Sequence, residues 1–205
     1  MIRLKVFPLI FFIICGIVQP GLAEQSGKAS QVIESLNSAL LDVMKNATAL
    51  GYQGRFEKLA QVIESTHDLE YIARFSIGKT SWDKLGDDQR QKFVDSFKQY
   101  SIATYASRFN GYSGETFRIT GEQAAKRGQI QVTSFLDIPG EESVDFMYLL
   151  LPDKGTLKIV NIIVDGVSDL ALKRSEFMSR LVDKGFEALL THLAEKTAEY
   201  AAVEK

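Results

Sequence analysis

The spacing of apolar residues predicts that the first half of the chain beyond residue 30 is helical. Apolar side chains recur every three or four positions, which is the period of one face of an α-helix. The predicted helices occupy residues 30–46, 56–67, 69–77 and a long segment from 86 to about 110. Within this pattern we expect Gly51 to stop the first helix, Asp68 to cap the third, and Gly78 to end it.

After Gly114 the apolar period shortens to every second residue, which is typical of β-strands. Four strands are predicted, at residues 115–123, 129–138, 144–151 and 157–164. The short segments between them are rich in turn-forming residues, so we expect an antiparallel meander. Two helices follow at 168–184 and 186–201, separated by Gly185. This order indicates an α+β domain, a four-stranded antiparallel sheet covered by N-terminal and C-terminal helices.

The third and fourth predicted strands carry apolar residues on both faces. In the fourth strand, simple alternation places Leu157, Ile159 and Ile163 on one face and Val160, Ile162 and Val164 on the other. An antiparallel sheet with one wet face shows polar residues at alternate positions instead. We therefore expect both faces of these central strands to be covered.

The long helix carries an aromatic stripe, formed by Phe93, Phe97, Tyr105 and Phe109. Aromatic residues at helical spacing most often belong to a packed core. Bulky rings fill space less completely than Leu or Ile, however, so the same stripe could wall a cavity.

The first 23 residues are typical of a secretory signal peptide. Arg3 precedes a short apolar run, and the small residues Gly21 and Ala23 form a cleavage site. The run is too short to span a membrane. Ile14 precedes Cys15, where a lipoprotein signal needs a small residue, so we expect no lipidation. The mature chain, residues 24–205, is expected to be one domain in the periplasm.

The net charge of the chain argues against two classes of binding partner, nucleic acids and anionic membranes. Removal of the signal peptide takes away two basic residues and the only cysteine, which changes the formal net charge from −2 to −4. An acidic chain lacks the basic surface that binds nucleic acid or an anionic membrane. An exported domain of this size without cysteine fits a bacterial periplasm.

The sequence lacks the motifs of catalysis and of cofactor binding. Neither His67 nor His192 has a second ligand at metal-binding spacing, and there is no nucleophile elbow or phosphate loop. His67 beside Asp68 is more typical of a helix cap than of a catalytic pair. We read Asn161, on the apolar fourth strand, as a structural residue that needs hydrogen-bond partners. The sequence therefore predicts no enzymatic activity, no metal and no cofactor.

Several segments carry a family resemblance when they are taken in order. They are the aromatic helix from Phe97 to Phe109, the "Y-x-G-E-x-F" segment 112–117, Val132-Thr133, the "V-x-G-V-S" stretch 164–168 with Arg174 and Phe177, and the tail 185–193. Together they resemble the MlaC family of periplasmic lipid-binding proteins, also called the toluene-tolerance family, over residues 31–193. Segment 50–56 is more similar to the hopanoid-associated HpnM branch. Asn161 and Lys173 depart from the family, which often has Asp and an aromatic residue there.

The resemblance implies a sheet and helices that enclose a deep apolar pocket for acyl chains. It implies a carrier of a phospholipid or hopanoid that performs no catalysis and does not insert stably into a membrane. The implied partners are an MCE-type inner-membrane transporter and an outer-membrane lipoprotein complex, or an HpnN-type exporter in the hopanoid branch.

We expect apolar residues of both layers to line this pocket. From the sheet these are Val132, Phe146, Tyr148, Val160, Ile162 and Val164, and from the helices Phe97, Tyr105, Leu170, Phe177, Leu181 and Leu189. Arg174 could hold a headgroup or an acidic group of a partner, but a structural ion pair is the favoured reading.

Two other functions stay open. A small enzyme of the ketosteroid-isomerase type would also have a deep apolar pocket, and Asp165 with Tyr148 is the pair that could serve it. A periplasmic adaptor or chaperone would have an exposed apolar groove and no small ligand.

Overall fold

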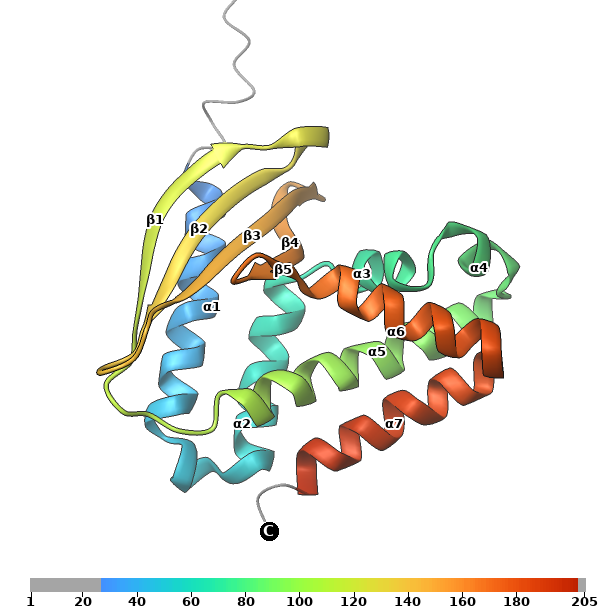
Figure 1. Ribbon diagram of the computed structural model, residues 1–205, viewed down its shortest axis with the longest axis horizontal. Coiled ribbons are helices and arrows are strands. Elements are labelled where there is room, and N and C mark those ends of the chain that lie inside the picture. The colour runs from blue at the N-terminus through green and yellow to red at the C-terminus, as the bar shows by residue number, and fades with distance from the viewer. Residues whose placement is uncertain (1–26, 203–205) are drawn as a thin grey trace, which may run out of the picture.

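The computed structural model describes residues 27–202, and the predicted signal peptide with Cys15 lies outside them. The helices are α1 (Lys28–Lys45), α2 (Ala47–Thr66), α3 (Leu69–Ile77), α4 (Lys79–Lys84), α5 (Asp87–Arg108), α6 (Asp169–Lys184) and α7 (Phe186–Ala202). The strands are β1 (Thr116–Ala124), β2 (Ile130–Asp137), β3 (Val144–Asp153), β4 (Thr156–Val164) and β5 (Val167–Ser168). Figure 1 shows the curved sheet at one end of the molecule, with α1 running along it, and α5, α6 and α7 at the other.

The sheet has five antiparallel strands in the order β1-β2-β3-β4-β5, so the prediction of four strands is wrong. The additional strand β5 has two residues and pairs with the end of β4. Asp165 and Gly166 connect the two strands, and both have a positive φ (48° and 80°), as a tight two-residue hairpin requires. A strand of two residues has no periodicity, so the apolar pattern could not reveal it.

A β-bulge in β4 changes which residues share a face. Ile159 pairs with Leu150 and Asn161 pairs with Leu149, which leaves Val160 as the extra residue. The bulge brings Ile159 onto the same face as Ile162, and Ile159 and Val160 are both buried. The predicted assignment of β4 residues to two faces is therefore wrong, because it assumed unbroken alternation.

Only one face of the central strands is fully buried. Tyr148 and Leu150 of β3 are at most 2% exposed, whereas their neighbours Met147, Leu149 and Leu151 are partly exposed. The expectation of two covered faces is therefore wrong for β3. An apolar core joins the buried face to the helices, with Leu36, Leu40, Phe93, Leu150, Ile159 and Phe177 each at most 1% exposed.

The helix boundaries follow local signals in the sequence with one exception. Asp68 caps α3 by accepting a hydrogen bond from the Tyr71 amide at 2.9 Å, and Gly78 ends the helix with φ 74°. Both predictions are confirmed. Gly51 does not stop the first helix, because α1 ends at Lys45 and Gly51 lies inside α2, where its φ of 56° produces a kink.

Two side chains connect distant elements. Arg55 is 1% exposed, and its Nε donates to the carbonyl oxygen of Ala106 at 2.9 Å, which ties α2 to α5. On β1, the Glu122 carboxylate accepts hydrogen bonds from the Gly27 amide (2.9 Å) and the Ser30 amide (2.8 Å) at the start of α1. Glu122 therefore satisfies donors that the helix itself cannot pair.

Across residues 27–202, none of the helices has both the length and the apolar character needed to cross a bilayer.

We expect Gly78→Ala to destabilise the protein by about 1–3 kcal/mol, because only glycine adopts this backbone conformation without strain. The added Cβ would also lie 2.9 Å from the Arg174 guanidinium. Gly121→Ala is the matched control, since its φ lies outside the left-handed region and the added methyl group meets open space. Denaturant unfolding of both variants measures the difference, and equal stabilities would contradict the strain at Gly78.

Candidate functional site

A cavity of about 150 Å³ lies between the sheet and the helices. Its wall combines the inner face of β3 and β4, the second half of α5 and the first turns of α6, with further residues from α1 and α3. The bulge contributes directly to this wall, because it turns the Val160 side chain inward, where it is 1% exposed. The cavity therefore forms where the two layers meet at β4.

Most of the residues predicted to contact lipid line this cavity. They are Phe97, Tyr105, Phe146, Tyr148, Val160, Ile162, Val164 and Leu170. The aromatic stripe of α5 divides. Phe93 belongs to the core alone, Phe97 belongs to both the core and the cavity wall, and Tyr105 and Phe109 line the cavity. Their contact with a lipid stays a prediction.

Four of the predicted residues do not line the cavity. Val132 is buried on β2, and Leu189 is buried on α7. Phe177 of α6 packs behind the wall, edge-on to Phe97 with 6.3 Å between the ring centroids. Leu181 lies one turn further along α6, half-buried against the core. Periodicity marks all four as inward-facing, but it cannot separate a packed position from a cavity wall.

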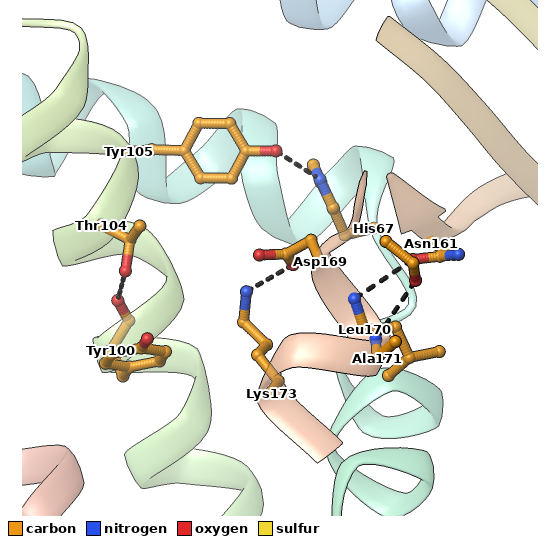
Figure 2. Close-up of polar contacts among 10 residues, drawn as sticks. His67, Tyr100, Thr104, Tyr105, Asn161, Asp169, Leu170, Ala171 and Lys173 are labelled. Carbon is orange, nitrogen blue, oxygen red and sulfur yellow. Dashed lines mark hydrogen bonds and ion pairs between the residues drawn. The ribbon is translucent and has the colours of Figure 1, made fainter. Parts of the chain in front are cut away.

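The deeper part of the wall has a buried polar pair that sequence reasoning missed. His67 lies at the junction of α2 and α3, and its Nε2 is 2.9 Å from the Tyr105 hydroxyl (Figure 2). Its Nδ1 lies 3.2 Å from the Ile63 carbonyl oxygen, which can only accept a hydrogen. Nδ1 therefore carries the proton, and Nε2 accepts a hydrogen bond from Tyr105. His67 serves as the C-cap of α2, as the sequence favoured, but also faces the cavity.

Burial sets the protonation of this pair. It lowers the pKa of His67 to about 4 and raises the pKa of the Tyr105 hydroxyl well above its usual value. Both side chains are therefore neutral at neutral pH. A neutral pair can line an apolar cavity without the large desolvation cost of a buried charge.

The first turn of α6 is fixed to the sheet by Asn161. Its side-chain oxygen accepts a hydrogen bond from the Leu170 amide at 3.2 Å (Figure 2) and another from the Ser168 hydroxyl at 3.1 Å. The Ser168 hydroxyl in turn accepts from the Ala171 amide at 3.1 Å. These contacts support the prediction that Asn161 is a structural residue. Its amide oxygen accepts hydrogen bonds from donors at the N-terminus of α6.

Charged side chains also line the cavity. Asp169 and Lys173 form an ion pair within α6, and the Lys173 ammonium lies 5.9 Å from the centre of the Tyr100 ring. Burial, together with repulsion from Arg108, lowers the pKa of Lys173. Arg108 itself is exposed at the end of α5. These three residues were not predicted as site residues.

Arg174 and Asp165 lie outside the cavity. The Arg174 side chain is exposed, and its Nη1 donates to the Phe75 carbonyl oxygen at 2.7 Å, at the end of α3. Asp165 is exposed in the β4–β5 turn, where its carboxylate accepts from the Asp145 amide at 2.9 Å. The structure therefore does not bring Asp165 and Tyr148 together in one pocket, as an isomerase site would require.

Comparison with known proteins identifies the family. The profile of the MlaC protein family matches residues 34–195. This chain belongs to the MlaC family. No curated protein matches it. Among solved structures, a phospholipid-binding protein from Ralstonia solanacearum, in complex with a phospholipid, is similar with a TM-score of 0.74 and 22% identity, and the alignment covers 85% of this chain and 99% of that one.

This membership points to a non-catalytic binding protein. Within the described residues, no group of three or more potential ligands could hold a metal ion. The MlaC fold accounts for the mixed architecture of sheet and helices, and it does not distinguish the hopanoid-associated branch from the rest of the family.

The buried His67 predicts a loss of stability in acid. Below pH 6.5 the unfolded chain binds a proton that the folded chain accepts only near pH 4, so the free energy of unfolding falls across this range. The shift corresponds to a loss on the order of 3 kcal/mol. Denaturant unfolding at pH 7 and pH 4 should show that His67→Gln loses less stability than the unmodified chain.

Tyr105→Phe is the control for this experiment. It removes the hydrogen bond to His67 but keeps the imidazole buried, so the loss of stability in acid should persist. An equal loss in His67→Gln and in the unmodified chain would contradict burial of His67 as the cause.

Proposed function

We propose that this protein is a periplasmic lipid carrier that holds acyl chains between its sheet and helices. The observation that carries the proposal is the apolar wall of the cavity at β4, in a chain of the MlaC family. The bound phospholipid in the similar Ralstonia solanacearum protein supports the choice of ligand. A phospholipid is therefore the favoured cargo, and a hopanoid is the alternative that segment 50–56 suggests.

Apolar contact suits transport because it is strong in sum and not directional. A diacyl lipid exposes about thirty methylene groups, and their transfer to water costs on the order of 20 kcal/mol. A wall of aliphatic and aromatic side chains offsets much of this cost without fixing the chain in one pose. The proposed mechanism is therefore burial and release, with no bond made or broken.

The cavity must widen to accept an acyl chain. Its volume of about 150 Å³ is similar to that of cavities that accept a single benzene ring. Helix α6 is the element best placed to move, because Phe177 is its one fully buried residue. Few buried contacts lower the free energy of a local opening. We infer that lipid enters as α6 separates from β4, which breaks the Asn161 hydrogen bonds to Ser168 and Leu170.

We propose the location and the partners on the basis of the family resemblance. The carrier would collect lipid from one membrane complex and deliver it to another across the periplasm. An MCE-type inner-membrane transporter and an outer-membrane lipoprotein complex are the proposed partners, and an HpnN-type exporter takes their place if the cargo is a hopanoid.

Extraction of the purified protein tests the proposal. We expect organic extracts of protein produced in a Gram-negative host to contain lipid in a fixed ratio to protein by mass spectrometry. Protein that carries no lipid and binds none when it is added would contradict the carrier function. An isomerase would instead turn over a steroid-like substrate. An adaptor would neither bind lipid nor turn over such a substrate.

Val164→Arg should reduce the lipid that copurifies by at least about fivefold, because it places a charge in the apolar wall. Val167→Arg is the matched control. Val167 is paired with Val164 across the β4–β5 hairpin but is 51% exposed, so this variant should keep its lipid. Equal lipid content in the two variants would mean that the β4 wall does not contact the cargo.

A further inference from the structure

The solvent-facing part of the cavity wall has more hydrogen-bond donors than acceptors. We define the mouth as Arg108, Asp169 and Lys173, the three charged residues that line the cavity. Arg108 has five N–H donors and makes no hydrogen bond or ion pair with any residue between 27 and 202. The Lys173 ammonium has three donors, and its one ion pair within the described residues is with Asp169.

The charge of the mouth is positive although the chain is acidic overall. The mouth contains two cationic side chains, Arg108 and Lys173, and one carboxylate, that of Asp169. The next carboxylate along α6, Glu176, does not line the cavity and is hydrogen-bonded to His192 Nε2 at 2.5 Å. A hydrogen-bond acceptor on a bound ligand would therefore lie beside a net positive charge at the mouth.

The burial of Lys173 shows that this charge belongs to the cavity and not to the open surface. Its side chain is only 12% exposed, and its ammonium lies 5.9 Å from the centre of the Tyr100 ring. Leu170, on the same face of α6, lines the apolar part of the cavity. A ligand with an apolar tail among the β4 residues would thus have its polar end beside Lys173 and Arg108.

We propose that the mouth binds the oxyanion of a lipid headgroup, either a phosphodiester or a carboxylate. This inference rests on the proposed carrier function and adds selectivity for lipids with an anionic head. The guanidinium of Arg108 donates to two oxygens of the anion, and the ammonium of Lys173 donates to one. Asp169 competes with the anion for Lys173 and so moderates the affinity, which favours release.

Binding of matched lipids to the delipidated protein tests this selectivity. The probes carry the same pyrene-labelled acyl chains and differ in their heads: phosphatidylglycerol, diacylglycerol and the corresponding free fatty acid. We expect phosphatidylglycerol to bind about tenfold more tightly than diacylglycerol. A preference for the fatty acid over diacylglycerol, without one for phosphatidylglycerol, would support the site with a carboxylate as its ligand.

Two substitutions should change the selectivity in opposite directions. Arg108→Gln should lower the ratio of the two affinities, phosphatidylglycerol to diacylglycerol, about fivefold, because it removes a charged donor. Asp169→Asn should raise the ratio, because it removes the competing carboxylate. Lys92→Gln is the control for Arg108, since Lys92 is an exposed cation on the same helix, away from the cavity, and the ratio should stay unchanged.

The outcomes separate this inference from the carrier function. If no probe binds, both proposals fail. If all probes bind with equal affinity in the unmodified chain and in the variants, the carrier function stands and the headgroup site is overturned. A fall in the ratio for Asp169→Asn as large as that for Arg108→Gln would also overturn it, because the effect would then not follow the charge.

Discussion

Ile159 and Asn161, two residues apart on β4, each hold a different part of the helical layer. The Ile159 carbonyl oxygen accepts a hydrogen bond from the Asp68 amide at 2.9 Å, at the junction of α2 and α3. Asn161 holds the start of α6 through its side chain. The bulged Val160 lies between these two attachments and faces the cavity. Because β4 fixes the two helical segments separately, the side chains between them need not close into a solid core.

The residues of the cavity wall change from apolar to charged. This change in polarity matches an amphipathic molecule, which has an apolar tail and a polar head. Val160 and Ile162 supply apolar contact, the neutral His67–Tyr105 pair adds polarity without charge, and Lys173 adds a charge that is mostly buried. None of these groups forms the arrangement of nucleophile, base and oxyanion donor that catalysis requires. The geometry is that of a binding site.

The sequence predicted much of this fold, because most of its elements are long enough to show a period. Helix α5 and the long strands follow directly from their apolar spacing. The bulge at Val160 and the two-residue β5 were missed, since one extra residue or one residue pair leaves no periodic signal. His67 was missed for another reason. Its role depends on a contact with Tyr105 across 38 positions, which local spacing does not reveal.

The cap that Glu122 provides for α1 has a consequence for how the chain assembles. Residue 27, just before α1, is a glycine and has no side chain to cap the helix, and the carboxylate that pairs its amide comes 95 residues later. During synthesis the segment of α1 emerges before β1. The first turn of α1 therefore lacks its carboxylate cap until the sheet has formed, so the first of these helices to emerge is among the last to be completed.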